Sequence, residues 1–256
     1  MDVALLQEAK PPPSELASMI EIDQQPPWIS AGTGKNKPWR AAIARLSDRI
    51  TLCSYKTRTI GTAQSDELAV SRLGTLAVAD VNVKATGEII TVVSMYGTWE
   101  SPVKQAKGNW IYADASVHRL ISDLSALIGR QRGHKIVAAG DLNILFGYGE
   151  ERSPYWKARY ETIFARFEAI GLCFLGPQAP EGGEQASPWP DELPTDSHNV
   201  PTYRTQRNRP ETATRQLDFV FASEAIADRI HVRALNQVEE WGRSDHCRIL
   251  IEIDDP

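Results

Sequence analysis

The chain has 256 residues, of which 42% are hydrophobic and 24% are charged, and this ordinary balance excludes disordered and fibrous proteins. Its formal net charge is −5, so the chain as a whole is not a polycation built to hold nucleic acid or an anionic membrane. A phosphate substrate remains compatible with this charge, because a bound divalent cation can supply positive charge locally.

Membrane spans and disulfide bonds find no support in the sequence. Every apolar run is shorter than the roughly 20 residues that a membrane-spanning helix needs. The cysteines, Cys53, Cys173 and Cys247, form no Cys-x-x-Cys pair, which predicts reduced and mostly buried thiols rather than a zinc ribbon or a disulfide framework. Together these features favour a cytoplasmic protein, unless a targeting segment precedes the recorded start.

The chain opens on a short apolar run, Val3 to Leu6, that leads into Gln7 and Glu8. An unbroken run of this kind is typical of a strand buried on both faces. After a set of prolines, the segment from Ser14 to Ile22 predicts a short helix. The segment from Gly32 to Lys37 lacks the residue spacing of a phosphate-binding loop, so we interpret it as a surface loop.

Several β-type segments follow. Ala41 to Leu46 and Ile50 to Ser54 are short and apolar. Leu73 to Val83 and Glu88 to Tyr96 are longer and rich in Val, Ile and Thr, and a turn at Lys84 to Gly87 separates them. This arrangement predicts an antiparallel hairpin formed by the two longer strands.

The middle of the chain alternates between strand and helix patterns. Ala115 to Gly129 has apolar residues at helical spacing, and Tyr155 to Gly171 is a second amphipathic helix. Lys135 to Gly140, between them, predicts another buried strand. The order of strand, helix and strand indicates an α/β sheet covered by helices.

The last third of the chain begins with a segment rich in Pro, Gly, Glu and Asp, from Gly176 to Val200. We interpret it as a long loop that is either functional or disordered. Leu217 to Ala222 and Arg248 to Ile253 predict closing strands. Neither a repeat nor a linker interrupts the series, so we predict a single domain over residues 1–256.

Polar residues lie at the ends of four of these strand-like runs. They are Gln7 and Glu8, then Asp141 and Asn143, then Asp218, and finally Asp245 and His246. A carboxylate at a strand end commonly serves a turn, but Asp218 lies between Leu217 and Phe219, where burial requires a partner or a metal. A hard cation such as Mg²⁺ takes oxygen ligands, and attack on phosphorus needs a base and groups that stabilise charge. The set therefore points to phosphoester hydrolysis.

These residues resemble the endonuclease/exonuclease/phosphatase superfamily, which includes deoxyribonucleases, abasic-site endonucleases, inositol polyphosphate phosphatases and sphingomyelinases. The resemblance rests on four short segments in the family's order along nearly the whole chain, Leu6–Glu8, Gly140–Asn143, Gln216–Val220 and Ser244–His246. Tyr96 is similar to the aromatic residue that a family strand carries into the site. The resemblance implies an α/β fold, the four-layer α/β/β/α sandwich of two packed mixed sheets.

The resemblance also implies a role for each polar residue. Glu8 binds the metal, which is Mg²⁺ or Mn²⁺, and Asp245 orients His246 or shares the metal. Asp141 orients or deprotonates the attacking water, or protonates the leaving group. His246 contacts the phosphate or assists proton transfer, and Asn143 donates a hydrogen bond to a phosphate oxygen. Asp218 belongs to the same hydrogen-bonded network, and Tyr96 points its hydroxyl at the phosphate. All of this requires that the residues converge on one pocket.

The chain departs from the family pattern at its N-terminus. Family members begin with a strand that carries an Asn ahead of the Gln-Glu strand, whereas here the Gln-Glu strand starts at Val3. We therefore expect that the first family strand is missing, through a displaced start or a truncated gene. A protein without that strand should be poorly stable, because the neighbouring strands lose backbone partners. A comparison with a chain extended upstream tests this expectation.

The leading hypothesis is a Mg²⁺-dependent phosphodiesterase, an endo- or exonuclease that acts on DNA or RNA. The alternatives are a phosphatase for small molecules or lipid head groups, and a truncated remnant without catalysis.

A few aromatic and basic residues could contact a nucleic acid. Tyr148, Arg152, Tyr155 and Trp156 could stack on a base or clamp a phosphate, or simply pack on the domain. Arg204 and Arg215 are either phosphate contacts or solvated arginines.

Overall fold

The computed structural model describes residues 1–17, 21–23, 28, 39–99, 113–128, 133–179, 193–194, 196–205 and 208–256. The chain divides into two compact units, Met1–Leu142 and Asn143–Pro256. The surface loop predicted at 32–37, and much of the long loop predicted at 176–200, lie outside the described residues.

Four neighbouring strands form the main sheet of the first unit, in the order β9-β8-β7-β4. Their bounds are Ile50–Ser54 for β4, Leu76–Val83 for β7, Ile89–Tyr96 for β8 and Ile136–Asp141 for β9. β7 pairs antiparallel with β4 and with β8, which confirms the predicted hairpin, and β8 pairs parallel with β9. The sheet is therefore mixed.

A second sheet of the first unit has the strand order β1-β3-β2. Its strands are Val3–Ala9 (β1), Glu21–Ile22 (β2) and Arg40–Arg45 (β3). β1 and β3 pack against β8 of the main sheet, and Ala42 and Ala44 of β3 form a smaller buried cluster with Ile22 of β2. The helix predicted from Ser14 to Ile22 begins as expected with α1 (Ser14–Ala17) but is wrong at Glu21 and Ile22, which form β2 and pair with β3.

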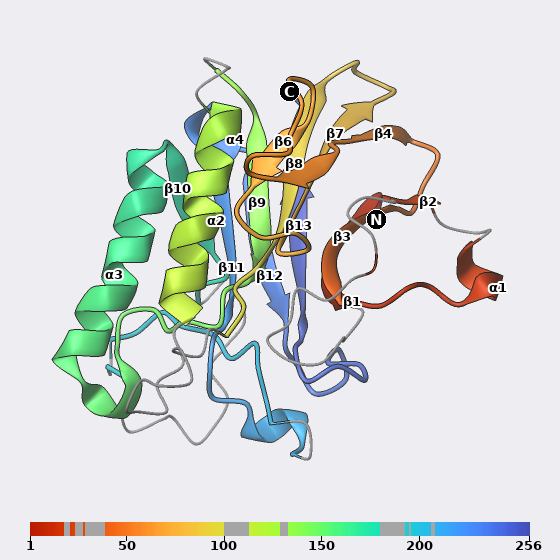
Figure 1. Ribbon diagram of the computed structural model, residues 1–256. Coiled ribbons are helices and arrows are strands. Elements are labelled where there is room, and N and C mark those ends of the chain that lie inside the picture. The colour runs from red at the N-terminus through yellow and green to blue at the C-terminus, as the bar shows by residue number, and fades with distance from the viewer. Residues whose placement is uncertain are drawn as a thin grey trace. The chain divides into compact units, whose positions relative to one another are not determined.

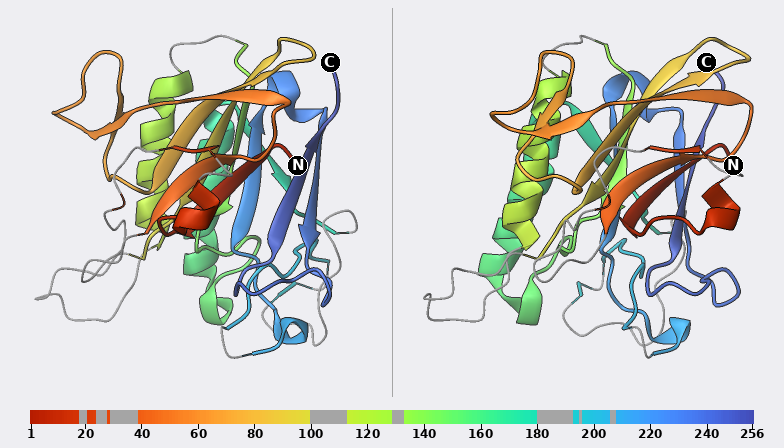
Figure 2. Two further views of the ribbon diagram at one scale, coloured as in Figure 1. Left: turned by 90° about the vertical axis from the view of Figure 1, so that its right-hand side faces the viewer. Right: turned by 45° about the vertical axis from the view of Figure 1, so that its right-hand side comes forward.

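One long helix, α2 (Ala113–Ile128), covers the main sheet on the side opposite β1 and β3 (Figures 1 and 2). It buries the apolar stripe that the sequence predicted, which includes Val117, Leu120, Ile121 and Leu124. A short parallel pair, β5 (Thr57–Thr59) and β6 (Leu68–Val70), lies beside it, and β6 contacts α2. The first unit is thus a helix over a mixed sheet over a second sheet.

The second unit also has a helix packed on one sheet and a second sheet packed against the first. Its elements are η1 (Glu150–Arg152), α3 (Pro154–Ala169), β10 (Leu172–Gly176), η2 (Pro210–Thr212), β11 (Asp218–Ser223), α4 (Glu224–Ala227), β12 (Ile230–Leu235) and β13 (Arg248–Ile253). β10 pairs antiparallel with β11, and β12 pairs antiparallel with β13. α3 packs on β10, and β10 packs on β12. The sequence predicted α3, β11 and β13 but neither β10 nor β12.

Aromatic side chains join α3 to its sheet. The ring of Phe167 stacks on Phe221 with centroids 3.9 Å apart, and the ring of Phe164 meets Phe174 and Phe219 edge-on. Such contacts bury large apolar surfaces with defined geometry. They hold β11, the strand that begins at Asp218, firmly against the helix.

The structure also bears on the expectations about the cysteines and about membrane-spanning helices. All three thiols are free, as predicted, but Cys53 is exposed and only Cys247 is buried. In the part of the chain that the structure describes, no helix is both long enough and apolar enough to cross a membrane.

Candidate active site

Glu8 lies at an irregularity in β1. The pairing of β1 with β3 shifts register between Leu6 and Ala9, and Glu8 has a left-handed backbone with φ of 48°. A β-bulge of this kind re-aims a side chain, and non-glycine residues adopt this conformation only where the surroundings enforce it. Here the amide of Gln7 donates to the Ser94 hydroxyl at 3.0 Å, and that hydroxyl donates to the Leu6 carbonyl at 2.8 Å. The bulge is therefore pinned to β8.

The bulge directs Glu8 to Tyr96, the last residue of β8. The Tyr96 hydroxyl donates a hydrogen bond to Oε1 of Glu8. Burial raises the pKa of Tyr96 well above its ordinary value, and the carboxylates of Glu8 and Asp141 raise it further. The phenol therefore stays protonated at any physiological pH and serves as a neutral hydrogen-bond donor.

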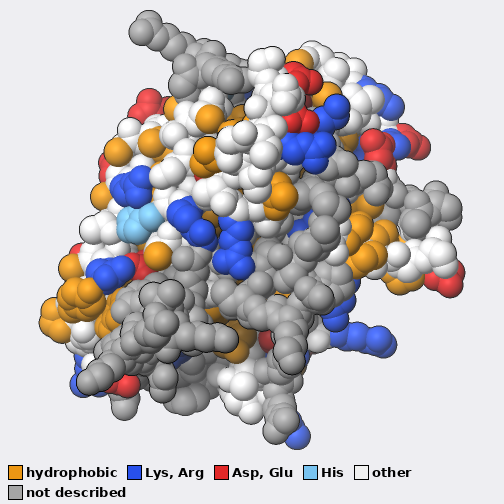
Figure 3. All heavy atoms as spheres, viewed as in Figure 1, with side chains coloured by type: hydrophobic (Ala, Val, Ile, Leu, Met, Phe, Trp, Pro, Cys, Tyr) orange, Lys and Arg blue, Asp and Glu red, His pale blue; other side chains and the backbone are white. Residues whose placement is uncertain are grey.

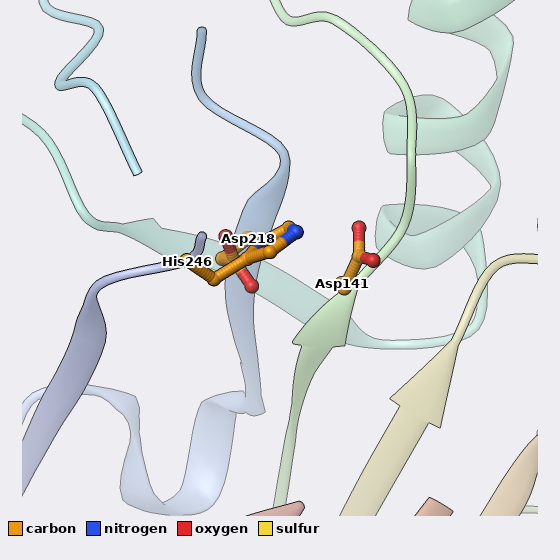
Figure 4. Close-up of side chains that lie close together, drawn as sticks. All are labelled: Asp141, Asp218 and His246. Atoms are coloured by element: carbon orange, nitrogen blue, oxygen red, sulfur yellow. Dashed lines mark hydrogen bonds and ion pairs between the residues drawn. The ribbon is translucent and has the colours of Figure 1, made fainter. Parts of the chain in front are cut away.

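Asp141 ends β9 beside the end of β8 (Figure 4). Tyr96 and Asp141 are register partners, and the Gly97 amide donates to the Asp141 carbonyl at 2.7 Å. Gly140 is required by this close approach, because a Cβ atom there would lie 1.8 Å from the Met95 carbonyl oxygen. Parallel strands place their final residues at one edge of the sheet. Three of the predicted site residues of the first unit, Glu8, Tyr96 and Asp141, therefore lie together.

Asp218 and His246 form the corresponding pair in the second unit. Nδ1 of His246 lies 2.8 Å from Oδ2 of Asp218 (Figure 4), and Asp218 is 7% exposed. The Asp218 amide donates to the hydroxyl of the fully buried Thr202 at 3.2 Å. A carboxylate on Nδ1 fixes the imidazole tautomer that leaves Nε2 as an acceptor, and it stabilises the ring when the ring is protonated. The Asp218 partner that burial required is thus His246.

The backbone on both sides of His246 is anchored to the core. The indole of Trp241, 1% exposed, donates to the Ser244 carbonyl at 3.0 Å, and the Cys247 amide donates to the Thr202 carbonyl at 2.9 Å. The Asp245 carbonyl accepts from the Arg204 amide at 2.9 Å, and the Asp245 side chain is half-buried. Asp218, which the sequence analysis placed only in the same network, is hydrogen-bonded to the His246 ring.

Comparison with known proteins identifies the fold. No protein-family model and no curated protein matches the chain, but solved structures do. The chain is similar to the endonuclease domain of TRAS1, a telomere-specific non-LTR retrotransposon, with a TM-score of 0.58 and 17% identity over 98% of this chain and 85% of that one. It is similar to an AP endonuclease from Leishmania major, with a TM-score of 0.56 and 14% identity over 100% and 79%.

A third similar structure is an endonuclease/exonuclease/phosphatase from Bacteroides vulgatus, with a TM-score of 0.53 and 14% identity over 99% of this chain and 85% of that one. The chain has the endonuclease/exonuclease/phosphatase fold. The α/β class and the mixed sheets expected from the sequence are thereby confirmed. Identities this low establish the fold, and the activity has to be argued from the side chains.

Within the endonuclease/exonuclease/phosphatase fold of this chain, Asn143 is the first residue of the second unit, two positions after Asp141. Its backbone is left-handed, with φ of 53°, a conformation that asparagine tolerates better than most residues. Its side chain is half-buried. The predicted contact of Asn143 with a phosphate oxygen stays a prediction.

The arginines weighed in the sequence support the loops of the fold. Arg204 donates to the carbonyls of Asn208 and Ser244. Arg215, three positions before Asp218, forms an ion pair with Glu150 at 3.2 Å. This ion pair links the segment that leads into β11 to the loop after β9. Both interactions shape the backbone around the Asp218–His246 pair. They accord better with a structural role than with direct phosphate binding.

The aromatic residues after β9 fall into two groups. Tyr148 is buried, at 4% exposure, whereas Tyr155 at the start of α3 is 59% exposed. The Arg159 guanidinium lies 5.6 Å from the Tyr155 ring centroid and 5.4 Å from that of Trp156, and it donates to the Tyr155 hydroxyl at 2.7 Å. Tyr155, Trp156 and Arg159 form an aromatic–cationic patch at the surface.

The sequence did not single out two residues that shape these groups. Thr202 holds the amides of Leu217 and Asp218 through one hydroxyl, and the guanidinium of Arg72 opposes the rise in the pKa of Tyr96. Neither belongs to a recognisable motif, because Thr202 precedes no strand pattern and Arg72 sits in a turn. A buried threonine or an arginine in a turn carries no distinguishing signal in a single sequence.

Proposed function

We propose that this chain is a divalent-cation-dependent phosphodiesterase and that its substrate is a nucleic acid. The observation that carries the proposal is the imidazole of His246 held at Nδ1 by the buried Asp218 carboxylate, on a fold shared with proteins named as endonucleases. A histidine oriented in this way is typical of a group that contacts an anion or transfers a proton.

The polar groups of the proposal come from both units. Glu8, Tyr96 and Asp141 contribute from the first unit, and Asn143 and the Asp218–His246 pair contribute from the second. The similarity to the comparison structures covers at least 98% of this chain and so includes both units.

The chemistry of the donors fits a hard divalent cation. Glu8 and Asp141 present carboxylate oxygens around a neutral phenol, and Mg²⁺ and Mn²⁺ prefer such oxygen ligands. Glu8 would hold the ion, and Asp245 would share it. When bound, the cation would neutralise charge on the phosphate and polarise its oxygens.

The side chains then account for the proton transfers of hydrolysis. Water oxygen bonds to phosphorus, the ester P–O bond breaks, one proton leaves the water and one proton reaches the departing oxygen. Asp141 and His246 are the two groups suited to carry these protons. The Asn143 amide, and the Tyr96 hydroxyl in place of its hydrogen bond to Glu8, would donate hydrogen bonds to the non-bridging oxygens, where negative charge develops.

Nucleic acid is favoured over a small phosphate ester by the aromatic–cationic patch of Tyr155, Trp156 and Arg159. Exposed rings that stack on bases are a common feature of proteins that bind single strands. On the face shown in Figure 3, basic side chains are interspersed with acidic and neutral ones. This mixed pattern favours recognition by a few placed groups over a broad electrostatic surface.

A cleavage assay tests the proposal. Purified protein should nick plasmid DNA and shorten labelled oligonucleotides in the presence of Mg²⁺ or Mn²⁺, and EDTA should abolish both reactions. Inorganic phosphate released from monoesters without any cleavage of DNA or RNA would instead establish the phosphatase alternative. Failure to turn over any phosphoester with either cation would favour a non-catalytic chain.

The aromatic–cationic patch provides a narrower prediction about the substrate. Replacing Tyr155 by serine should raise KM for a single-stranded oligonucleotide about tenfold while kcat changes little, because one stacked base is lost. Steady-state kinetics on oligonucleotides measure this, and Val238→Ser, which also removes an exposed apolar side chain from the second unit, is the matched control. Equal KM values for both variants would remove Tyr155 from substrate binding.

A further inference from the structure

Arg72 occupies a turn that is rigidly held. It lies between β6 and β7, next to Ser71, whose amide lies 3.0 Å from both carboxylate oxygens of Asp123 in α2. The Ser71 hydroxyl donates to the same carboxylate at 2.8 Å. Asp123 is 4% exposed, so the carboxylate that holds Ser71 is buried. Burial raises its pKa, and the hydrogen bonds from Ser71 offset that effect.

A second set of contacts joins Arg72 to the end of β8. The Thr75 hydroxyl donates to the Arg72 carbonyl at 3.0 Å, and the Tyr96 amide donates to the Thr75 carbonyl at 2.8 Å. Nη1 of Arg72 donates to the Thr98 hydroxyl at 2.9 Å. Thr98 is in turn fixed by Ser116 of α2, whose hydroxyl accepts from the Thr98 amide at 3.0 Å. Both the backbone and the side chain of Arg72 are therefore tied to the strand end that carries Tyr96.

The charge of Arg72 acts on Tyr96, whose hydroxyl is hydrogen-bonded to Glu8. Its guanidinium lowers the pKa of Tyr96, against the effects of burial and of the two carboxylates. Arg72 is half-buried, and a cation in such a position is screened less than one at the open surface. A second arginine, Arg119, lies near enough that Arg72 lowers its pKa, after the larger effect of burial.

We propose that Arg72 is a substrate-binding residue whose guanidinium holds the non-bridging oxygens of the phosphate beside Tyr96. A guanidinium is planar and offers paired N–H groups whose spacing matches two oxygens of a phosphate. The contacts from Thr75, Thr98 and Asp123 fix its position before substrate arrives, which lowers the cost of ordering it. This inference rests on the proposed function, because the phosphate at Tyr96 is part of that proposal.

The experiment combines kinetics with a measurement that needs no catalysis. Replacing Arg72 by methionine should lower kcat/KM for oligonucleotide cleavage about fiftyfold, and Arg72→Lys should recover part of it, since lysine keeps the charge but loses the paired donors. In parallel, inorganic phosphate should raise Tm of the unmodified protein, and this shift should vanish in Arg72→Met. The control is Arg58→Met, which removes an arginine of the same unit that pairs with Glu67.

The outcomes separate the two proposals. If the unmodified protein cleaves DNA while Arg72→Met retains both full kcat/KM and the phosphate-induced rise in Tm, the assignment of Arg72 is overturned and the phosphodiesterase stands. If no phosphoester is cleaved but phosphate stabilises the protein only when Arg72 is present, the anion site stands and the phosphodiesterase fails. A loss of phosphate stabilisation that is equal in Arg58→Met would also overturn the assignment.

Discussion

Replacing Asp141 by asparagine should lower kcat for phosphodiester cleavage about a thousandfold, with little change in KM. Asparagine has the same shape but neither accepts nor delivers a proton near neutral pH. Asp141 is 5% exposed at the end of β9, and the close contact of Gly140 with Met95 keeps the backbone in place. The effect should therefore come from lost proton transfer, with the fold intact.

A matched control separates chemistry from structure. Asp80 in β7 accepts hydrogen bonds from Thr91 at 2.7 Å and from Tyr55 at 3.2 Å, so Asp80→Asn makes the same change in the same sheet away from the candidate site. Its kcat should stay within about twofold of the unmodified protein, as expected for a residue outside the chemistry. If Asp141→Asn keeps a similar share of its kcat, Asp141 takes no part in the reaction.

Combining Asp141→Asn with His246→Ala tests whether these two residues act in the same step. Groups that act together in one step are strongly non-additive, so the double variant should be about as impaired as the worse single variant. Residual kcat values of single and double variants, measured on one oligonucleotide, give the answer. Losses that multiply would mean that Asp141 and His246 act independently, and their shared role in proton transfer would be abandoned.

The sequence was most informative where one element carries one periodic pattern. The hairpin of β7 and β8 and the stripe of α2 were predicted because their alternating or helical spacing is long and unbroken. β10 and β12 were missed, because β10 is a five-residue strand directly after α3 and β12 mixes His231 and Arg233 into its exposed face. The helix predicted across residues 14–22 was wrong at Glu21 and Ile22, because pairing with β3 outweighs the local preference there.

The candidate site was also predictable only where the signal is local in the sequence. Strand-end carboxylates can be recognised from sequence, since Asp218 within an apolar run requires a partner. Which partner it has depends on tertiary structure, and His246 lies 28 positions further along the chain. The bulge that turns Glu8 toward Tyr96 and the turn that carries Arg72 arise from hydrogen bonds to Ser94 and Asp123. Those contacts join segments that no local pattern connects.

The largest effect on stability should come from Arg40→Met in β3. The Arg40 side chain is fully buried, and its Nη1 lies 2.6 Å from Oδ2 of Asp23, whose side chain is 3% exposed. Nη2 donates to the Asp23 carbonyl, and the guanidinium lies 4.0 Å from the Trp28 ring centroid. Removing the cation leaves a buried carboxylate uncompensated, which should cost about 3–5 kcal/mol in the free energy of unfolding.

The pH dependence and a second substitution identify the cause of that loss. Burial already raises the pKa of Asp23 while Arg40 opposes it, so the variant should raise this pKa further. A carboxyl group whose pKa is higher in the folded than in the unfolded state binds more protons when folded, and stability is regained as pH falls toward the unfolded value. The loss of stability of Arg40→Met, measured in denaturant titrations, should therefore shrink from neutral to mildly acidic pH.

Adding Asp23→Asn to Arg40→Met should recover part of the lost stability at neutral pH. In the unmodified protein the Ile43 amide donates to Oδ1 of Asp23 at 2.7 Å, and the amide oxygen of asparagine can still accept this hydrogen bond. A deficit unchanged by pH and by the second substitution would trace the loss to packing around Trp28.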